Sequence, residues 1–436
     1  MLAGASCRLP ASGFPLPAFR FPRPHPLSAP APRTRTRTRA RYNSAMRKLA
    51  TMVCLVAAAA TAGAQRGGGG GQFPGGTNPD GSLRPSRPVA NLFTQDAYTE
   101  YSILEPGSES FRIRYLFETT RAGATEMVNA TRGGSEGSGV EVYDPRTGQP
   151  LKFVYEQSQN DPEVHQIRAT LPQPVPEGGV GRLLIYKTYK DPRTYMMNGK
   201  DVVWVRSLAG YRLGVILPKG YAFISSDIAA QVSTTADGRL KLAFANPSGQ
   251  SNPLTIHARP TTAVFTPSSF DDMFFDDVKT LYDLDAPETG RVAIEQIYSD
   301  YRKGERARLD SLAYLPLEDL SVIDLDTAKA LPSVKEKGAA FAKLDVPIAA
   351  ERQSAHLKIT GTLKAPGYTL VGSDLVFQRT FKGLRNTVLL PKGWEVSAVS
   401  QSATIGTDRN GRAFVSLINL NAENNYKVTI RAKRGA

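Results

Sequence analysis

Short runs of alternating hydrophobic and polar residues dominate the chain from about Val89 onward. In residues 111–117 (FRIRYLF) and 427–431 (KVTIR), a β-branched or aromatic residue stands at every second position. This period of two is typical of strands with one buried face. The runs are separated by turn sequences such as Asp237-Gly238 and Asn410-Gly411, which accept the positive φ angles of tight hairpins. Many short strands at this spacing predict β-sandwich domains.

The strand pattern occurs twice along the chain. Residues 203–221 (VWVRSLAGYRLGVILPKGY) align without gaps on residues 376–394 (VFQRTFKGLRNTVLLPKGW), a shift of 173 positions. Towards the N-terminus the shift grows to 181, where Ile113 matches Ile294, as small loop deletions would produce. A repeat of this length is a whole domain, so the sequence predicts a tandem duplication.

A short helix is predicted before each domain. In the second domain, apolar residues recur at helical spacing at Phe270, Met273, Phe274, Val278 and Leu281. Ser269 and Asp272 resemble a capping box at its start. The counterpart in the first domain comprises Leu92, Phe93, Asp96 and Thr99.

An export signal is predicted near the N-terminus. Met46 is followed by two basic residues, an apolar run over residues 49–61, and Ala62-Gly63-Ala64. This order is that of a secretory signal peptide cleaved near Ala64-Gln65. We therefore expect a secreted or periplasmic protein, and no later segment is long and apolar enough for a transmembrane helix.

The other N-terminal segments are interpreted from composition. Residues 1–45, with arginines alternating with threonines, are an untranslated or disordered leader, or alternatively an organelle transit peptide. Residues 46–64 are the signal peptide, and residues 65–88, rich in glycine and proline, are a flexible linker. The two β-sandwich domains are predicted over residues 89–262 and 268–436.

Charge and cysteine content limit the function classes. The formal charge is +14, but residues 1–64 hold ten basic and no acidic residues, which leaves 44 basic against 40 acidic residues elsewhere. A body so close to neutral gives no reason to expect nucleic-acid binding. Cys7 and Cys54 both precede the predicted cleavage site, so the mature chain is expected to be cysteine-free, without disulfides or thiolate chemistry.

One segment matches a nucleophile motif. Residues 133–137 (GGSEG) satisfy G-x-S-x-G, but a nucleophile elbow requires a strand, a turn and then a helix. Here a strand is predicted after the motif, at residues 140–143, so we interpret the motif as a flexible loop. An anion cradle formed by its backbone N–H groups is the alternative.

The histidines are few and lack zinc-ligand spacing. His257 aligns with Arg431 in the other copy, and His356 aligns with Arg182. A position filled by histidine in one copy and arginine in the other indicates an exposed polar site. His165 has no clear counterpart. The sequence therefore predicts no metal ligands and no cofactor.

Carboxylates and aromatics offer weaker candidates. Asp271, Asp272, Asp276 and Asp277 could suggest calcium, but on the predicted helix the first two favour the helix dipole instead. The pairs Asp283/Asp285 and Asp324/Asp326 are expected on solvated strand faces. The aromatics Trp204/Phe377 and Tyr221/Trp394 recur in both copies, which favours core packing over a sugar-binding platform. No catalytic residue is assigned.

Residues 101–186 resemble the N-terminal β-domain of aminopeptidase-N-type metallopeptidases. The similarity rests on residues 101–117, the hairpin at 140–151 and the segment ATLPQPVPEGGVGRLLIY at 169–186. It implies the fold only, because the zinc-binding catalytic domain of those enzymes is missing. The chain also resembles exported β-rich bacterial proteins. The predicted fold class is all-β, with two tandem, duplicated β-sandwich domains of immunoglobulin-like or aminopeptidase-N-terminal-domain-like type.

Three hypotheses of function follow. The first is a non-catalytic, extracytoplasmic binding or scaffold protein with a protein or polysaccharide partner. The second is a glycosidase- or peptidase-class hydrolase whose carboxylates meet only in the folded chain. The third is an accessory subunit of an exported peptidase.

Overall fold

The computed structural model describes residues 97–435, apart from 132, 160, 209, 247–250, 269–277, 302–305, 310–316, 337–338 and 421–424. All described residues belong to one compact unit. They are built almost wholly from strands in six sheets, with one 3-10 turn at Pro287–Thr289. The predicted all-β class with tandem sandwiches is confirmed. The leader, the signal peptide and the linker at 65–88 lie outside the described residues.

The first half of the fold runs from β1 to β14. Its strands are β1 (Ala97–Ile103), β2 (Ser110–Thr119), β3 (Glu126–Ala130), β4 (Glu136–Tyr143), β5 (Phe153–Gln157), β6 (His165–Thr170), β7 (Gly181–Lys190), β8 (Tyr195–Asn198), β9 (Asp201–Leu208), β10 (Arg212–Ile216), β11 (Tyr221–Ser226), β12 (Gln231–Thr234), β13 (Leu240–Ala245) and β14 (Asn252–Pro260). They form sheets of order β12-β13-β10-β1-β2-β7-β4, β11-β14-β9-β8 and β3-β6-β5.

The second half runs from β15 to β29. Its strands are β15 (Val278–Leu284), β16 (Arg291–Asp300), β17 (Arg306–Leu309), β18 (Glu318–Asp324), β19 (Lys329–Ala330), β20 (Ser333–Glu336), β21 (Ala339–Ile348), β22 (Ala355–Lys364), β23 (Tyr368–Val371), β24 (Asp374–Phe381), β25 (Arg385–Leu389), β26 (Trp394–Val399), β27 (Thr404–Thr407), β28 (Ala413–Ile418) and β29 (Tyr426–Arg434). The sheets are β19-β18-β22-β16-β15-β25-β28-β27, β26-β29-β24-β23 and β17-β21-β20.

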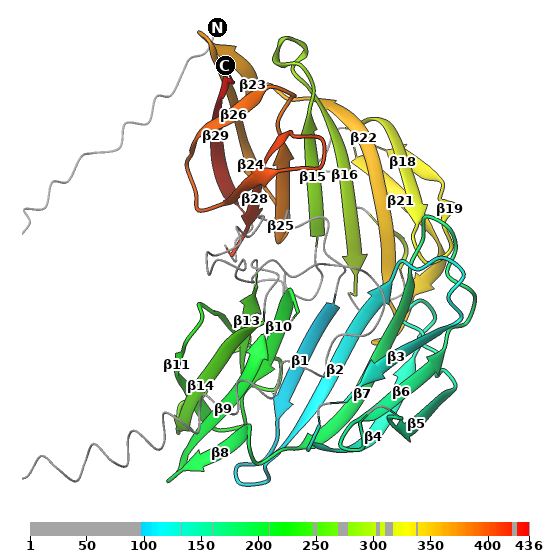
Figure 1. Cartoon of the computed structure of the whole chain (residues 1–436), viewed down its shortest axis with the longest axis vertical. Coiled ribbons are helices and arrows are strands. Elements are labelled where there is room, and N and C mark those ends of the chain that lie inside the picture. Colours follow the sequence, from blue (N-terminus) through cyan, green and yellow to red (C-terminus); the bar gives the residue numbers. More distant parts are fainter. Residues whose placement is uncertain are drawn as a thin grey trace, which may run out of the picture. The chain divides into compact units, whose positions relative to one another are not determined.

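The two halves have the same topology, strand for strand, apart from the added β19. In Figure 1, β15, β16 and β22 lie side by side in the same order as β1, β2 and β7. The register agrees as well. Ile113 pairs with Tyr101, and its repeat equivalent Ile294 pairs with Tyr282, itself the equivalent of Tyr101. The duplication inferred from the sequence is therefore present in the backbone.

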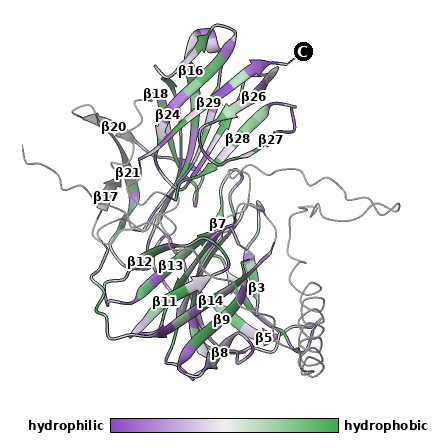
Figure 2. Ribbon diagram, turned by 90° about the vertical axis from the view of Figure 1, so that its left-hand side faces the viewer, coloured by the Kyte–Doolittle hydropathy of each residue, from purple (hydrophilic) through white to green (hydrophobic). Residues whose placement is uncertain are grey.

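Each half encloses its own apolar core between its sheets. The first core gathers around Trp204 and Phe111, and the second around Phe377 and Phe381. Alternation places these residues inward, and Figure 2 shows hydrophobic and hydrophilic positions alternating along the strands. The recurrent aromatics Trp204/Phe377 and Tyr221/Trp394 are all buried, as core packing requires.

The predicted helices are not found where the structure can be compared. Val278 and Leu281 lie in β15, and Thr99 lies in β1; the remaining helix positions fall outside the described residues. β15 is a central strand, bonded to β16 on one side and to β25 on the other. Because both sides of its backbone are paired, apolar spacing that suited a helix is overridden by the sheet.

Candidate functional site

The two halves meet through backbone hydrogen bonds that are equivalent in the repeat. The Val180 N–H donates to the Leu325 carbonyl at 2.8 Å, and the Ser354 N–H donates to the Pro145 carbonyl at 2.7 Å. Val180 corresponds to Ser354, and Pro145 corresponds to Leu325, so each half presents the same two positions to the other. This is the pattern of an isologous dimer interface, contained here in one chain.

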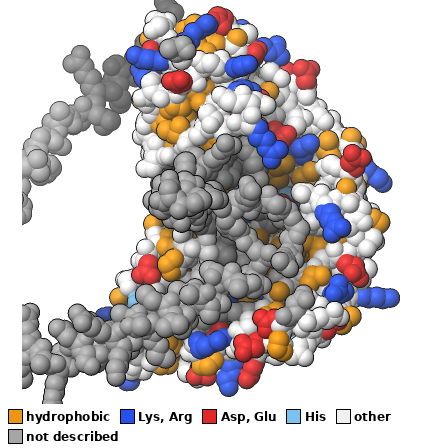
Figure 3. Space-filling view, in the orientation of Figure 1, with side chains coloured by type: hydrophobic (Ala, Val, Ile, Leu, Met, Phe, Trp, Pro, Cys, Tyr) orange, Lys and Arg blue, Asp and Glu red, His pale blue; other side chains and the backbone are white. Residues whose placement is uncertain are grey.

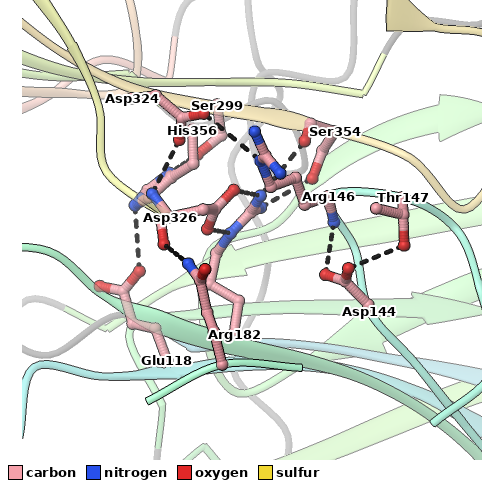
Figure 4. A network of polar contacts seen from close by, with 11 residues as sticks. Glu118, Asp144, Arg146, Thr147, Arg182, Ser299, Asp324, Asp326, Ser354 and His356 are labelled. Atoms are coloured by element: carbon pink, nitrogen blue, oxygen red, sulfur yellow. Dashed lines mark hydrogen bonds and ion pairs between the residues drawn. The ribbon is translucent and has the colours of Figure 1, made fainter. Parts of the chain in front are cut away.

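A buried arginine crosses this contact (Figure 4). Arg182 on β7 donates two hydrogen bonds to the carboxylate of Asp326, at 2.6 and 2.5 Å, and a third to the Ser354 hydroxyl at 2.7 Å. Burial acts to lower the pKa of Arg182, but the attraction of Asp326 outweighs it and the pKa is raised. The bidentate geometry fixes the orientation of one half against the other.

Matching turns support this pair from both sides. Asp144 accepts a hydrogen bond from the Arg146 N–H, and Asp324 accepts one from the Asp326 N–H, each at 2.9 Å. The second residue of each turn reaches the other half: Arg146 contacts Asp324 at 3.4 Å, and Asp326 binds Arg182. Burial, and then the neighbouring Asp326, raise the pKa of Asp324.

A hydroxyl, an imidazole and a carboxylate line up beside this pair. The Ser299 Oγ lies 2.8 Å from the Nδ1 atom of His356, and the His356 Nε2 atom lies 3.2 Å from an oxygen of Glu118. Ser299 and His356 are paired across β16 and β22, whereas Glu118 comes from β2 of the first half. Lys279 approaches the other Glu118 oxygen at 3.9 Å. The arrangement has the components of a proton relay.

The relay is closed off from solvent. Glu118 is 9% exposed, Ser299 4% and His356 3%. The adjoining cavity, which both halves line, holds about 10 Å³, which is space for about one water molecule. A serine nucleophile must reach a substrate carbonyl at about 3 Å, with oxyanion donors beside it. This geometry instead suits a polar network that holds two packed surfaces together.

Comparisons with known proteins yield weak structural similarities. A zinc metallopeptidase of the M1 family from Deinococcus radiodurans is 14% identical with a TM-score of 0.28, over 46% of this chain and 45% of that chain. An aminopeptidase N family protein from Idiomarina loihiensis is 7% identical with a TM-score of 0.25, over 37% and 29%. A candidate protease from Parabacteroides distasonis is 10% identical with a TM-score of 0.23, over 78% and 93%.

The chain spans less than half the length of the M1 structures that it matches. No family model and no curated protein matches the chain. The resemblance to the N-terminal domain of M1 aminopeptidases is thus a weak resemblance of fold.

The G-x-S-x-G segment does not form a nucleophile elbow. The Ser135 hydroxyl is buried and donates to Asp191 at 3.0 Å. β4 begins at the next residue, Glu136, so a strand follows and not a helix. Residues 133–135 lie in the turn that precedes β4, in agreement with the loop interpretation, and the buried Asp191 carboxylate accepts the hydrogen bond of the Ser135 hydroxyl there.

The structure agrees with the prediction for His257 and contradicts the prediction for His356. His257 is partly exposed and its equivalent Arg431 is exposed, as expected for a polar surface position. For His356 and Arg182 the prediction of an exposed site is wrong, since both are buried where the halves meet. His165 is partly exposed and stacks on Tyr155, with ring centroids 5.2 Å apart.

The predictions for the carboxylates also have different outcomes. Asp324 and Asp326 are 8% and 9% exposed, so a solvated strand face is the wrong interpretation for this pair. Asp283 is bound by Arg412 at 2.5 Å and remains partly exposed. Asp271, Asp272, Asp276 and Asp277 lie outside the described residues. Within the described ranges, no three His, Cys, Asp or Glu side chains converge as metal ligands would.

Sequence reasoning missed Glu118, Ser299 and the role of Arg182. A usable signal was present in the repeat alignment, because Glu118 matches Ser299 and Arg182 matches His356. Each pair places polar residues in both copies, within strands whose neighbours are apolar. Such positions fit a polar contact between copies, as at a dimer interface, and fit a solvated strand face equally well, so the alignment selects these residues without deciding their burial.

Proposed function

We propose that the chain is a non-catalytic binding or scaffold protein that acts outside the cytoplasm. The observation that carries the proposal is the closure of the Ser299–His356–Glu118 relay inside the contact between the halves. The Ser299 hydroxyl is buried, and the cavity beside it is too small for a substrate. The extracytoplasmic location rests on the signal peptide predicted at residues 46–64.

The buried ion pairs support the same role. Charged groups removed from water specify one arrangement of two surfaces more than they add stability. Arg182 and Asp326 therefore give the two sandwiches a defined mutual orientation, which a scaffold requires. No helix in the described part of the chain is long and apolar enough to cross a membrane.

A hydrolase is the second candidate, because Ser299, His356 and Glu118 are the residue types of a nucleophilic relay. In the Ser-His-Asp triad, Nε2 of the histidine faces the serine hydroxyl and Nδ1 faces the carboxylate. In this protein, Nδ1 of His356 faces the hydroxyl and Nε2 faces the carboxylate. Together with the burial of the hydroxyl, this favours the structural role.

Turnover assays distinguish the two candidates. The purified protein and its Ser299→Ala variant should be tested on peptide, ester and glycoside substrates. We expect no turnover above the blank for either protein. Turnover that Ser299→Ala abolishes, while the thermal midpoint stays unchanged, would overturn the non-catalytic proposal. Ser135→Ala serves as the matched control, since its hydroxyl is also buried against a carboxylate.

A further inference from the structure

The turns between the two outermost strands at one end of each large sheet are equivalent in the repeat. Residues 235–239 (TADGR) join β12 to β13, and residues 408–412 (DRNGR) join β27 to β28. The Gly238 N–H donates to the Thr235 carbonyl at 3.0 Å, and the Gly411 N–H donates to the Asp408 carbonyl at 3.2 Å. Gly238 and Gly411 have φ of 79° and 76°. The two turns therefore share one conformation, although their side chains differ.

In the first half, the aspartate of this turn is held by its neighbours. The Thr235 hydroxyl donates to one oxygen of Asp237 at 2.5 Å, and the Arg239 Nε donates to the other at 2.8 Å. The hydrogen bond from Thr235, together with the charge of Arg239, holds the pKa of Asp237 below its usual value. A backbone nitrogen can displace a side-chain oxygen of aspartate only from the neutral acid, since the oxygen leaves as water. The ionised Asp237 is therefore protected from that reaction.

In the second half, Asn410 stands in the place of Asp237. Its hydrogen bond to the Asp408 carboxylate, at 2.8 Å, comes from the backbone N–H and not from the side chain, which is exposed. A side-chain amide is neutral at every physiological pH, so ionisation does not protect it. The next residue, Gly411, has no Cβ to shield the backbone nitrogen that follows the asparagine. Nitrogen and amide carbon belong to neighbouring residues, so their reaction is intramolecular.

We propose that Asn410 is a site of spontaneous deamidation. The Gly411 backbone nitrogen loses its proton to a base in the solvent and forms a bond to the side-chain carbonyl carbon of Asn410. The bond from that carbon to Nδ2 breaks, and the amide group takes up a proton and leaves as ammonia. Water then opens the five-membered imide at either carbonyl carbon, which gives aspartate or isoaspartate. No atom is oxidised or reduced, and the turn gains one negative charge at neutral pH.

The arginine of each turn shows what the new charge would contact. In the first half, Arg239 binds Asp237 within the turn. In the second half, the equivalent Arg412 binds Asp283 on β15, at 2.5 Å. The first-half equivalent of Asp283 is Ser102. The arginine thus binds a carboxylate in both copies, but the carboxylate comes from a different position in each.

Deamidation would therefore place two carboxylates beside Arg412. The product at position 410 corresponds to the carboxylate that binds the arginine in the first half, and it would compete with Asp283. Asp408, which replaces the threonine of the first-half turn, adds a further negative charge. Figure 3 shows basic and acidic side chains intermixed over the surface, so the added charge acts through these neighbours and not through the net charge. The turn would hold β15 less tightly.

Peptide mapping by mass spectrometry tests the site in the full-length protein, incubated at mildly alkaline pH. The matched control is Asn198, which also precedes a glycine but belongs to β8 and pairs with Asp201. Ring closure at Asn198 requires a strand pair to open, whereas Asn410 lies between strands. We expect deamidation at Asn410 to be about tenfold faster or more, with isoaspartate among the products and a rate that rises with pH.

Three outcomes would overturn the proposal. They are no product at Asn410, an equal or higher rate at Asn198, and aspartate without isoaspartate, because direct hydrolysis of the side chain yields aspartate alone.

Thermal unfolding tests the consequence for Arg412 separately. Asn410→Asp, which installs one product directly, should lower the thermal midpoint by about 1 °C in the wild-type background. In an Asp283→Ser background, which carries the residue of the first half, the same change should raise the midpoint by about 1 °C, since the new carboxylate takes over Arg412. Equal shifts in the two backgrounds would contradict competition for this arginine.

Discussion

At the scale of single residues, one pair of equivalent positions holds an ion pair in the first half and two apolar side chains in the second half. In the first half, Lys241 lies 2.6 Å from Glu100, and both side chains are nearly buried. Burial acts to raise the pKa of Glu100, but Lys241 and Arg114 outweigh it and hold that pKa below its usual value. In the second half, the equivalents of Glu100 and Lys241 are Leu281 and Phe414, which pack together.

The pair can therefore be exchanged as a unit but not in part. Lys241→Met should lower the free energy of unfolding by about 3 kcal/mol, because it leaves a buried carboxylate without its ammonium partner. The double variant Glu100→Leu with Lys241→Phe should lie within about 1 kcal/mol of the wild type. Urea unfolding measures both, and a double variant as unstable as the single one would contradict the exchange.

Lys187 introduces a dependence on pH. Its side chain is 4% exposed, and its amine donates to the Asn129 side chain at 2.6 Å. Burial, and to a lesser extent Arg206, lower its pKa from 10.5 to about 7. Between these values the unfolded chain binds the proton that the folded chain has lost, so stability rises with pH from about 7 to 10.5.

Lys187→Met should remove that rise and stabilise the protein below pH 7, by up to about 5 kcal/mol. The exposed neighbour on the same strand, Lys190, provides the control, and Lys190→Met should leave the pH profile unchanged. The measurement is urea unfolding at intervals between pH 6 and 10. An unchanged profile in Lys187→Met would rule out the buried amine as its source.

At the scale of elements, the turn from β24 to β25 carries the chain from one sheet to the other and sets the parallel pair β15–β25. Gly383 in this turn has φ of 76°, and a Cβ there would lie 2.7 Å from the Cβ of Val278, at the start of β15. Its equivalent Gly210 has no positive φ, and a Cβ there would meet nothing nearer than 3.9 Å. The second copy has thus become dependent on glycine at this turn.

Gly383→Ala should lower the free energy of unfolding by about 2–3 kcal/mol, from backbone strain and the contact with Val278. Gly210→Ala should change it by less than about 0.5 kcal/mol. Thermal and urea unfolding of the two variants compare the equivalent turns directly. Equal effects would show that strain at Gly383 does not distinguish them.

At the scale of the whole molecule, the two halves are joined as the subunits of a symmetric dimer would be. Equivalent backbone positions meet at Val180/Leu325 and Ser354/Pro145, while the side chains around them have diverged. In a strictly symmetric dimer, every contact between different positions would occur twice, once from each subunit. Because the two copies have diverged, a contact here can occur once. Arg182 faces Asp326, whereas the repeat equivalents of these two residues are His356 and Arg146.

Removing the carboxylate should therefore weaken the whole molecule. Asp326→Ala should cost about 3–5 kcal/mol, because it leaves a buried guanidinium without its bidentate partner. Glu288→Ala, which removes an exposed ion pair with Arg434, should cost less than about 1 kcal/mol. Urea unfolding with a tryptophan signal from each half, Trp204 and Trp394, follows both. A loss below about 1 kcal/mol in Asp326→Ala would contradict a role in holding the halves.

The sequence by itself determined the strand class and the duplication. Alternation reports which face of a strand is buried, and repeated residues such as Ile113 and Ile294 report the register. It also placed the core aromatics. It could not determine which polar residues are buried where the two halves meet, such as Glu118, Arg182 and His356.

Only the tertiary structure decided those positions, for a physical reason. A polar residue within a strand has the same local pattern whether it faces water or a second polar surface, because alternation records the side of the sheet and not what lies against it. The helix predicted at Val278 and Leu281 failed on the same ground: their spacing is local, whereas β15 is fixed by hydrogen bonds to β16 and to the distant β25.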